Sequence, residues 1–444
     1  MHLRRTALIA GAALLALVAG CTEKAAGPSN SIDDAIALYG TDGVMATSFG
    51  DAVNDPGAIA GMAGTAALTP LPTSFKNRIK AQDPTVEEYN YAGEAYDAVV
   101  ITALAADLAH STDSRTIASY VTGVTIKSGN GSECTTYIEC LTVLESGRDI
   151  AYRGYSVHNG LTAAGEPSVA EFGTQHFNDA NQIDDQKTEF VSAGDPGSAS
   201  KAKAPTPVPP GDKYQGPELK LGILLAKTGV LAPNNKPIFA AVKLAIKDIN
   251  NAGGVLDKQV TPIYGDDGTD PAKAVNSAKS LIDKGVDAII GPSFSGAAAK
   301  CIPIASAAGV MMISPSATSS ALSAVPDQGL FFRTSPSDSL QAQAIADVIM
   351  RGGAQKVFLV ARDDTYGQGL EKDLTAALTS NGIPKTSIKA AEYSTADGAN
   401  NAAAFASMAT AVREFQADSV VLLGYDETAG MVSALLADKV TFRN

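Results

Sequence analysis

An acidic stretch and a serine-rich stretch hold the side chains most able to do chemistry. DDGTDPAKAV (266–275) has three close aspartates without the spacing of a calcium loop, and a strand end followed by a helix N-cap explains it. GPSFSG (291–296) has the wrong spacing for the G-x-S-x-G elbow of hydrolases. The sequence has no Walker phosphate loop, and its four histidines form no metal-spaced cluster with cysteine. These patterns argue against an enzyme, and we expect neither a metal nor a cofactor.

Three hydroxyl side chains and one acid follow predicted strands. Ser295 begins a helical pattern, and Ser316 and Thr318 lie in SPSATS after another apolar strand. Serine and threonine favour helix caps, so capping and ligand binding both remain open for these residues. Asp42, in LYGTDGV, lies in a glycine-rich turn, which a solvated turn would also explain.

The composition predicts a globular, acidic protein. The chain has 444 residues, 45% of them hydrophobic and 18% charged, which suits two or three domain-sized cores. Its formal net charge of −13 gives a surface that repels phosphate groups. We therefore do not expect a nucleic-acid partner.

The N-terminus has the pattern of an export signal. Residues 1–20 combine a short basic segment with an apolar run that is too short to span a bilayer. The residues VAGC (18–21) resemble a bacterial lipobox, in which the cysteine thiol is lipidated. We expect an exported lipoprotein facing the periplasm or the cell exterior, anchored through Cys21 and a polar tether at 21–30. Plain secretion with an incidental cysteine is the alternative.

The other cysteines favour structural roles. Cys134 and Cys140 lie close together in a polar loop, and an oxidising compartment favours a disulfide between them. Cys301 lies within a helical pattern, where a buried, inert thiol is expected.

The remaining chain divides at a linker. Residues 193–218 are rich in proline, glycine, serine and lysine, which predicts an extended connection. After it, apolar strands alternate with amphipathic helices in two runs, predicted as a first lobe core at 219–335 and a second at 336–444. Residues 31–192 make no comparable alternating domain and look like fragments that complete another fold.

The two segments resemble one family in reversed order. Residues 219–444 carry AIKDINNAGGV, YGDDGTDPAKAV, DAIIGPSFSG, GVMMISPSATS, LFFRTSPSD, DDTYGQGL and VLLGYDETAGM, which resemble the start and middle of the leucine/isoleucine/valine type of periplasmic binding protein, the type I solute-binding receptors of ABC importers. Residues 31–192 carry LYGTDGV, GMAGTAAL, YAGEAYDAVVITALA, YRGYS and AGEPSVAEFG, which resemble its end. The resemblance implies two doubly wound, parallel-sheet lobes joined by hinge strands. The simplest hypothesis is a circular permutation; a truncated tandem duplication or a misassembled gene is the rival.

The resemblance also implies a ligand site between the lobes. It assigns the carboxylate of an amino acid to Ser295, Ser316 and Thr318, and the ammonium to Asp42. Tyr366 in DDTYGQG and Tyr425 in LLGYDE match positions that face the cleft. An ABC permease in the membrane would read the closed form.

Two departures leave the ligand open. The loop TGVLAPNNKP lacks the aromatic residue that valine-type receptors place against the side chain, and it brings Asn234 and Asn235 nearby. YSVHNGLTAAGEP lacks the usual Gly-Pro turn. The ligand could be a branched-chain amino acid, a polar one, or an amide or urea-like solute. A sensor of the same fold without a transport role, or a poorly folding rearranged chain, are the alternatives.

Overall fold

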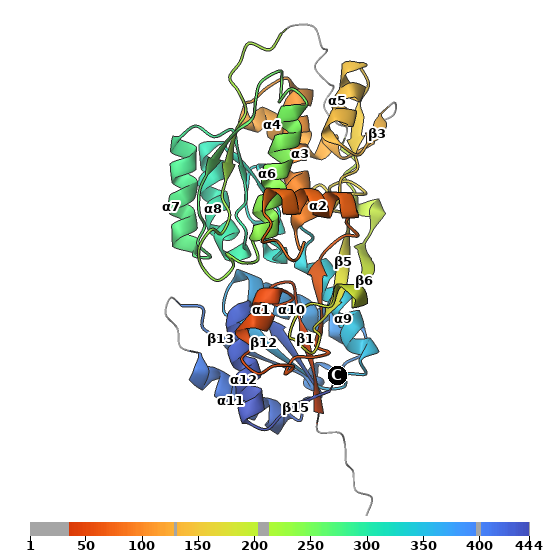
Figure 1. Cartoon of the computed structure of the whole chain (residues 1–444), viewed down its shortest axis with the longest axis vertical. Helices are drawn as coiled ribbons and strands as arrows, with labels where there is room; N and C mark the ends of the chain where they lie inside the picture. The colour runs from red at the N-terminus through yellow and green to blue at the C-terminus, as the bar shows by residue number, and fades with distance from the viewer. Residues whose placement is uncertain (1–34, 128–130, 203–212, 397–400, 444) are drawn as a thin grey trace, which may run out of the picture. The chain divides into compact units, whose positions relative to one another are not determined.

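Five parallel strands build the sheet of the first lobe (Figure 1). The computed structural model describes residues 35–127, 131–202, 213–396 and 401–443. The sheet order is β11-β10-β9-β7-β8, with β7 at Lys220–Ile223, β8 at Thr261–Tyr264, β9 at Ala288–Ile290, β10 at Met311–Ser314 and β11 at Phe331–Arg333. Between them run helices α6 (Lys236–Asn251), α7 (Pro271–Asp283) and α8 (Ser295–Ala308). Every residue of β9 and β10 is buried, as apolar strands covered on both faces require.

The second lobe contains a larger, mixed sheet. Its order is β13-β12-β14-β1-β2-β5-β6, and β15 also pairs with β1. The strands are β1 Ala35–Gly40, β2 Ala63–Ala67, β5 Val169–His176, β6 Glu189–Gly194, β12 Val357–Arg362, β13 Ile388–Tyr393, β14 Ser419–Leu423 and β15 Thr441–Phe442. Its helices are α1 Thr47–Ala52, α9 Asp338–Arg351, α10 Thr365–Ser380, α11 Ala402–Phe415 and α12 Ala429–Ala437. The predicted α/β fold with two lobes built on parallel strands is confirmed, and β5 and β6 extend the second sheet as antiparallel strands.

Short single-turn helices lie in the connections. They are η1 Asp185–Lys187, η2 Pro196–Ser198, η3 Ser320–Ala324, η4 Lys385–Ser387 and η5 Asp426–Thr428. The chain passes between the two lobes at 68–72, 153–168 and 334–337, and again between β6 and β7. These crossings are where a change in the angle between the lobes would be absorbed.

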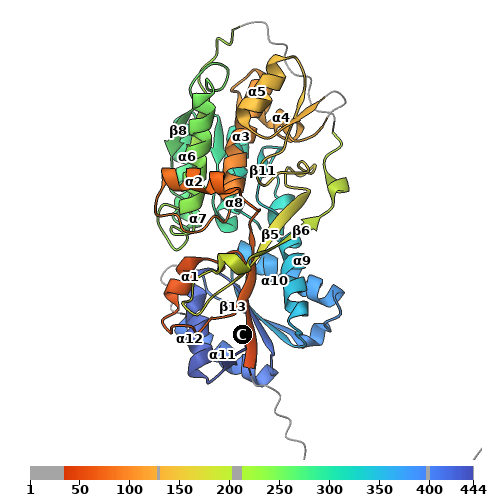
Figure 2. The same cartoon turned by 45° about the vertical axis from the view of Figure 1, so that its right-hand side comes forward.

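The N-terminal segment supplies the centre of the second-lobe sheet. β1 lies between β14 and β2, with Ala37 in register with Ser419 (Figure 2). β15 adds to the same strand, because the backbone N–H of Arg443 donates to the carbonyl of Ile36 at 3.0 Å. The contact between Arg443 and the 35–39 region, expected if the two segments complete one fold, is therefore present in this chain.

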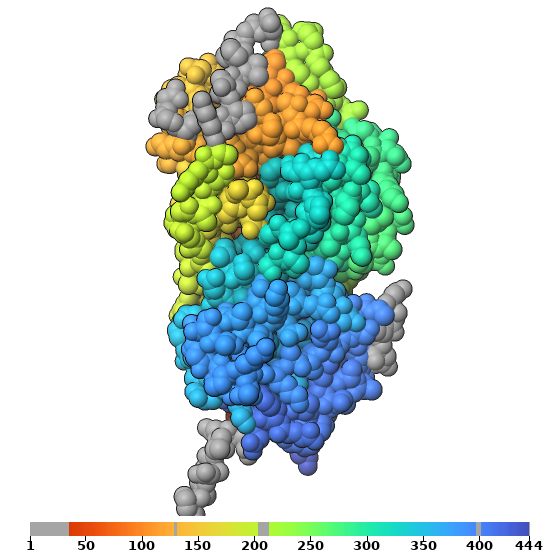
Figure 3. Space-filling model, turned by 180° about the vertical axis from the view of Figure 1, so that it is seen from behind, coloured from red at the N-terminus to blue at the C-terminus, as the bar shows by residue number. Residues whose placement is uncertain are grey.

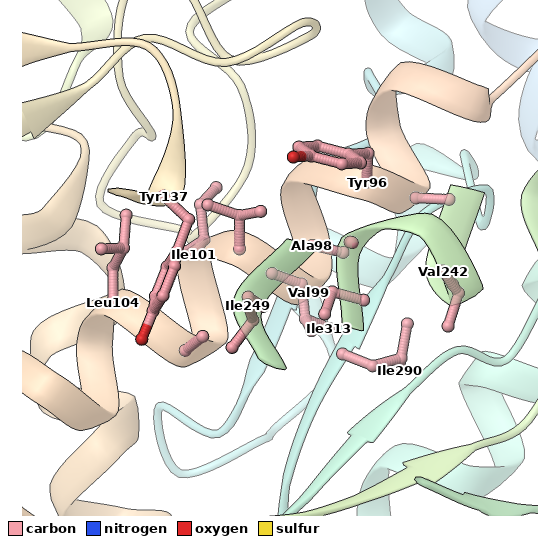
Figure 4. Close-up of a cluster of buried hydrophobic side chains, with 14 of the residues drawn as sticks. Tyr96, Ala98, Val99, Ile101, Leu104, Tyr137, Val242, Ile249, Ile290 and Ile313 are labelled. Carbon is pink, nitrogen blue, oxygen red and sulfur yellow. The ribbon is translucent and has the colours of Figure 1, made fainter. Parts of the chain in front are cut away.

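The same segment fills the core of the first lobe. Helices α2 (Thr73–Gln82), α3 (Ala92–Ala109) and α4 (Ser114–Val124) come from it. Val99 of α3 packs with Val242 of α6, Ile290 of β9 and Ile313 of β10 (Figure 4). α3 is apolar on almost every side, which is the pattern of a helix buried all round. On the surface, the orange and yellow N-terminal segments lie directly against green and cyan ones (Figure 3).

A small subdomain holds the cysteines. β3 (Ser132–Cys134) pairs with β4 (Ile150–Tyr152), and α5 (Tyr137–Glu145) lies between them in the chain. Cys134 and Cys140 form the disulfide that the sequence predicts. Cys301 is a buried free thiol, and burial raises its pKa to about 12, which suits an inert side chain.

The predicted linker is shorter than 193–218. Ala193 and Gly194 belong to β6, and the N–H of Ser200 donates to the carbonyl of Leu161. Asp195 accepts from the N–H of Gly197 and so caps a turn, which folds this polar stretch onto the sheet edge. Residues 203–212, and the predicted signal, Cys21 and tether at 1–30, lie outside the described residues. Within the described ranges, no helix combines the length and the apolar character needed to cross a bilayer.

Candidate functional site between the lobes

A pocket lies between the lobes at the carboxyl ends of their strands. It holds about 520 Å³ of space free of protein atoms, open solvent included. Asp42 follows β1, Tyr366 follows β12, Tyr425 follows β14, and Ser295 follows β9. Parallel strands that end at one sheet edge bring such residues together from distant parts of the chain. The pocket is lined by Asp42, Gly43, Glu88, Asn90, Tyr91, Leu231, Asn234, Asn235, Ile238, Ser293, Phe294, Ser295, Ser316, Thr318, Tyr366 and Tyr425.

All six residues that the sequence singles out for ligand binding line this pocket: Asp42, Ser295, Ser316, Thr318, Tyr366 and Tyr425. Those from the first lobe present hydroxyls and a helix start. The Ser295 Oγ accepts from the N–H of Ser319 at 3.1 Å, which leaves its own proton available. The Ser316 Oγ donates to the carbonyl of Ser293 at 2.9 Å, so its hydroxyl serves the fold.

The second lobe presents Asp42, with each oxygen held by a tyrosine. Tyr366 donates to Oδ1 and Tyr91 donates to Oδ2, both at 2.7 Å. Burial raises the pKa of the Asp42 carboxyl, while the two tyrosine hydroxyls act in the opposite direction. Tyr366 also stacks on Tyr425, with ring centroids 5.4 Å apart. The Arg362 guanidinium lies 4.1 Å from the centre of the Tyr425 ring, which is a cation–π contact.

Tyr91 is a site residue that the sequence reading missed. It precedes α3 of the first lobe, so its bond to Asp42 joins the two lobes. Its backbone has a φ of +61°, in the left-handed region that non-glycine residues rarely adopt. The surrounding structure maintains backbone strain of this kind, which is common at binding sites. No local sequence pattern predicts it at this position.

Further bonds bridge the lobes around residues 45–48. The N–H of Thr47 donates to Glu88 at 3.0 Å, and the Asn90 amide donates to the carbonyl of Met45 at 2.9 Å. The Ser48 hydroxyl lies 3.2 Å from the amide oxygen of Asn234. These contacts hold the two lobes together over the pocket, which is the arrangement expected of a closed cleft.

A second acid lies behind Asp42. Asp338 is fully buried at the start of α9, and neither of its carboxyl oxygens has a hydrogen-bond partner among the described residues. Burial, followed by the charge of Asp42, raises the pKa of Asp338 well above its usual range. Two interacting buried carboxyls do not both ionise easily, and Asp42 is the one that accepts two tyrosine hydroxyls. The tyrosine donors favour the charge on Asp42, whereas burial and the charge of Asp42 favour the protonated form of Asp338.

Glu88 is the other acid that lines the pocket. Burial raises its pKa to about 7, against the lowering effect of its bond from the Thr47 N–H. The negative charge of Asp426 raises the pKa of Glu88 further. The sequence reading did not single out Glu88, because it lies in a polar loop, EEYNY, that reads as solvent-exposed.

Part of the chain is similar to known proteins. A sequence model described as periplasmic binding protein matches residues 218–438. The Leu/Ile/Val-binding protein homolog 3 of Brucella melitensis is 27% identical over 224 residues, which cover 50% of this chain and 58% of that protein. The Leu/Ile/Val-binding protein of Escherichia coli K12 is 30% identical over 156 residues, covering 35% of this chain and 42% of that protein. The chain thus spans about half the length of these relatives.

Solved structures also match. The leucine binding protein LivK of Thermotoga maritima is 22% identical with a TM-score of 0.41, covering 46% of this chain and 55% of that chain. LivJ of Streptococcus pneumoniae, solved in complex with isoleucine, is 26% identical with a TM-score of 0.38, covering 46% of this chain and 57% of that chain. Through residues 218–438, the chain belongs to the periplasmic binding protein family of the leucine/isoleucine/valine-binding type.

Proposed function

We propose that the protein is the solute-binding receptor of an ABC importer and binds an amino acid between its lobes. The names of its relatives, which are Leu/Ile/Val-binding proteins, support this role. The observation that carries it is the meeting of Asp42 and Ser295 in one pocket. They come from different lobes and offer opposite chemistry, which is what the two ends of a zwitterion require.

The carboxylate of the ligand would bind at the start of α8. The residue before this helix provides no side-chain cap, so the N–H groups of its first turn have no cap partner. Such N–H groups and the positive end of the helix dipole favour an anion. The free proton of the Ser295 hydroxyl adds a donor, and Thr318 lies in the same wall.

The ammonium group would bind Asp42. Both oxygens of this carboxyl already accept a tyrosine hydroxyl, and each oxygen has a second acceptor position. The tyrosines hold the carboxyl in place before the ligand arrives. A preorganised charge in a closed site binds an ammonium more strongly than a mobile surface acid would.

Closure would couple binding to transport. A ligand that touches Asp42 of the second lobe and Ser295 of the first stabilises only the closed form. A permease that recognises the closed face would then receive loaded receptor. Contacts to both lobes make the amino acid bind the closed form more tightly than the open form. Without that difference in affinity, no ligand could shift the equilibrium between the two forms.

Calorimetry with the standard amino acids tests the proposed function. At least one of them should bind, and the same one should raise the thermal midpoint, since it binds the folded state alone. A folded chain that binds none of them would remove the proposal. Catalytic turnover of a bound solute would show that the protein is an enzyme rather than a receptor.

We propose that the order of the segments is a circular permutation. The support is the position of β1, which takes its place between β14 and β2 inside one sheet. A rearranged chain that runs from 219 to 444 and then from 31 to 192 should fold and bind the same amino acid. Loss of folding in that chain, with the natural order intact, would favour a tandem duplication or a misassembled gene.

Export and lipid anchoring are part of the same proposal. The lipobox-like VAGC pattern supports a lipid on Cys21, with the lobes outside the cytoplasm. Cys21→Ser should move the protein from the membrane to the soluble fraction after export. A Cys21→Ser protein that still partitions into membranes would argue against the anchor.

A further inference from the structure

Two residues that line the pocket have a buried side-chain oxygen without a partner. The side-chain oxygens of Asn90 and Asn235 accept no hydrogen bond from any described residue. Both residues line the pocket, and they are only 7% and 2% exposed. A buried acceptor without a partner costs about 1–3 kcal/mol, so folded proteins rarely leave two of them in one place.

The orientation of both amides is fixed by the fold. The Asn90 nitrogen donates to the carbonyl of Met45, and the Asn235 nitrogen donates to the carbonyl of Leu231, both at 2.9 Å. Turning either amide would place an oxygen against a carbonyl oxygen, which is repulsive. The two free atoms are therefore acceptors rather than donors.

The position of Asn235 explains why the protein leaves its oxygen free. Asn235 is the N-cap residue of α6, where an asparagine oxygen usually accepts from the N–H two or three positions later. Here its backbone has helical angles (φ −85°, ψ −7°), and its side chain makes no capping bond. Pro237, two positions on, has no N–H to offer.

A third acceptor and an acid also line the pocket. Glu88, Asn90, Asn234 and Asn235, which we name the polar cluster, all line it. Residues 45–48 tie three of them together, through Thr47 to Glu88, Met45 to Asn90 and Ser48 to Asn234. The pocket-lining residues include the carboxyls of Asp42 and Glu88 but no lysine, arginine or histidine.

Apolar side chains complete this part of the wall. Leu231 and Ile238 line the pocket beside the two asparagines 234 and 235. They provide contact for methylene groups, as a long polar side chain needs between its backbone and its tip. Acceptors, one acid and a short apolar wall together describe a site for a carbon chain that ends in N–H groups.

We propose that the ligand is an α-amino acid whose side chain ends in N–H donors, such as an amide, guanidinium or ammonium group. This inference rests on the proposed function and specifies its ligand class. Asp42 and the start of α8 bind the groups common to all amino acids, and the polar cluster binds the side chain. A branched aliphatic side chain would leave the oxygens of Asn90 and Asn235 buried and unpaired in the complex.

Calorimetry on the full chain compares arginine, lysine, glutamine and asparagine with leucine, isoleucine and valine. The tightest member of the first group should bind at least about 100-fold more tightly than any of the second, because buried acceptors reject a ligand without donors. Equal or tighter binding of an aliphatic member overturns the inference and leaves the proposed function standing. Binding of none of the seven overturns this inference, whereas binding of some other standard amino acid still upholds the receptor.

Two variants assign the effect to the polar cluster. Asn235→Leu should reduce the ratio of the affinity for the polar ligand to that for the aliphatic amino acids at least about 10-fold. Asn250→Leu is the control: Asn250 lies on the same helix, outside the pocket lining, and bonds with Val260 through both amide atoms. The Asn250→Leu variant should keep the same ratio of affinities as the unaltered chain. Glu88→Gln should weaken arginine and lysine about 10-fold and leave glutamine unchanged; equal losses for both kinds of ligand overturn the role of Glu88. The panel on the unaltered chain stands even if a variant misfolds.

Discussion

The Asp42 part of the pocket and the polar cluster differ in how far the protein satisfies its own polar atoms. Each oxygen of Asp42 accepts a tyrosine hydroxyl at 2.7 Å, from Tyr366 and Tyr91. In the polar cluster, the oxygens of Asn90 and Asn235 accept nothing from the described residues. The difference separates a rigid, completed part that suits a group shared by all amino acids from an incomplete part that a particular side chain must complete.

The largest expected effect comes from removing the completed part. Asp42→Ala should reduce the affinity for the best amino acid of the panel by about 3–5 kcal/mol, because it leaves an ammonium unpaired in a closed site. Calorimetry measures the loss directly. An unchanged affinity would show that Asp42 does not bind the ligand, and the Asp42 part of the pocket would then have no binding role to compare with that of the polar cluster.

Asp42→Asn serves as the matched variant. It keeps the size of the side chain and one acceptor oxygen for a tyrosine hydroxyl, but it loses the second acceptor and the charge. A loss close to that of the alanine variant would assign the effect to charge. A recovery of most of the affinity would assign it to shape and hydrogen bonding.

A smaller effect should follow from loosening Asp42 without removing it. Tyr366→Phe keeps the ring that stacks on Tyr425 but deletes the hydroxyl that donates to Oδ1. We expect a loss of affinity of about 1.5–3 kcal/mol, the range for hydrogen bonds to charged groups. Tyr264→Phe, on a half-exposed tyrosine of β8 outside the pocket, is the control and should change nothing. Equal behaviour of the two variants would show that the hydroxyl does not prepare Asp42.

The two parts of the pocket also differ in how well the sequence predicted them. Asp42, Ser295 and Tyr366 lie at strand ends within motifs that resemble the family, so local pattern was enough to single them out. Asn234 and Asn235 stood out only as a departure from that pattern. The unpaired oxygen of Asn235 depends on the backbone angles before α6 and on the contact with Leu231, which no residue spacing specifies.

Tertiary contacts hid other residues from the sequence. Asp338 reads as an ordinary acid in the first turn of a helix, where the dipole favours it. Only the folded chain shows that it is fully buried and that the charge of Asp42 acts on it. The opposite error occurred at 193–200, where small polar residues read as a linker. Backbone pairing to β5 and to Leu161 was not visible in composition.

The smallest expected effect concerns the charge of the polar cluster, and pH measures it. Glu88 has a pKa of about 7 in the folded, ligand-free chain, against an ordinary value of 4.5. Between these values the unfolded chain has lost a proton that the folded chain keeps, so the free energy of unfolding falls as pH rises from 5 to 8. Because Glu88 is partly exposed, its share is on the order of 1 kcal/mol. Other buried acids with raised pKa values, such as Glu94 at about 8, add to the same slope.

Denaturant unfolding at several pH values should therefore show a flatter slope for Glu88→Gln than for the unaltered chain. An unchanged slope would mean that Glu88 is charged in the empty pocket, and the polar cluster would then match the Asp42 part in holding its charge before any ligand binds.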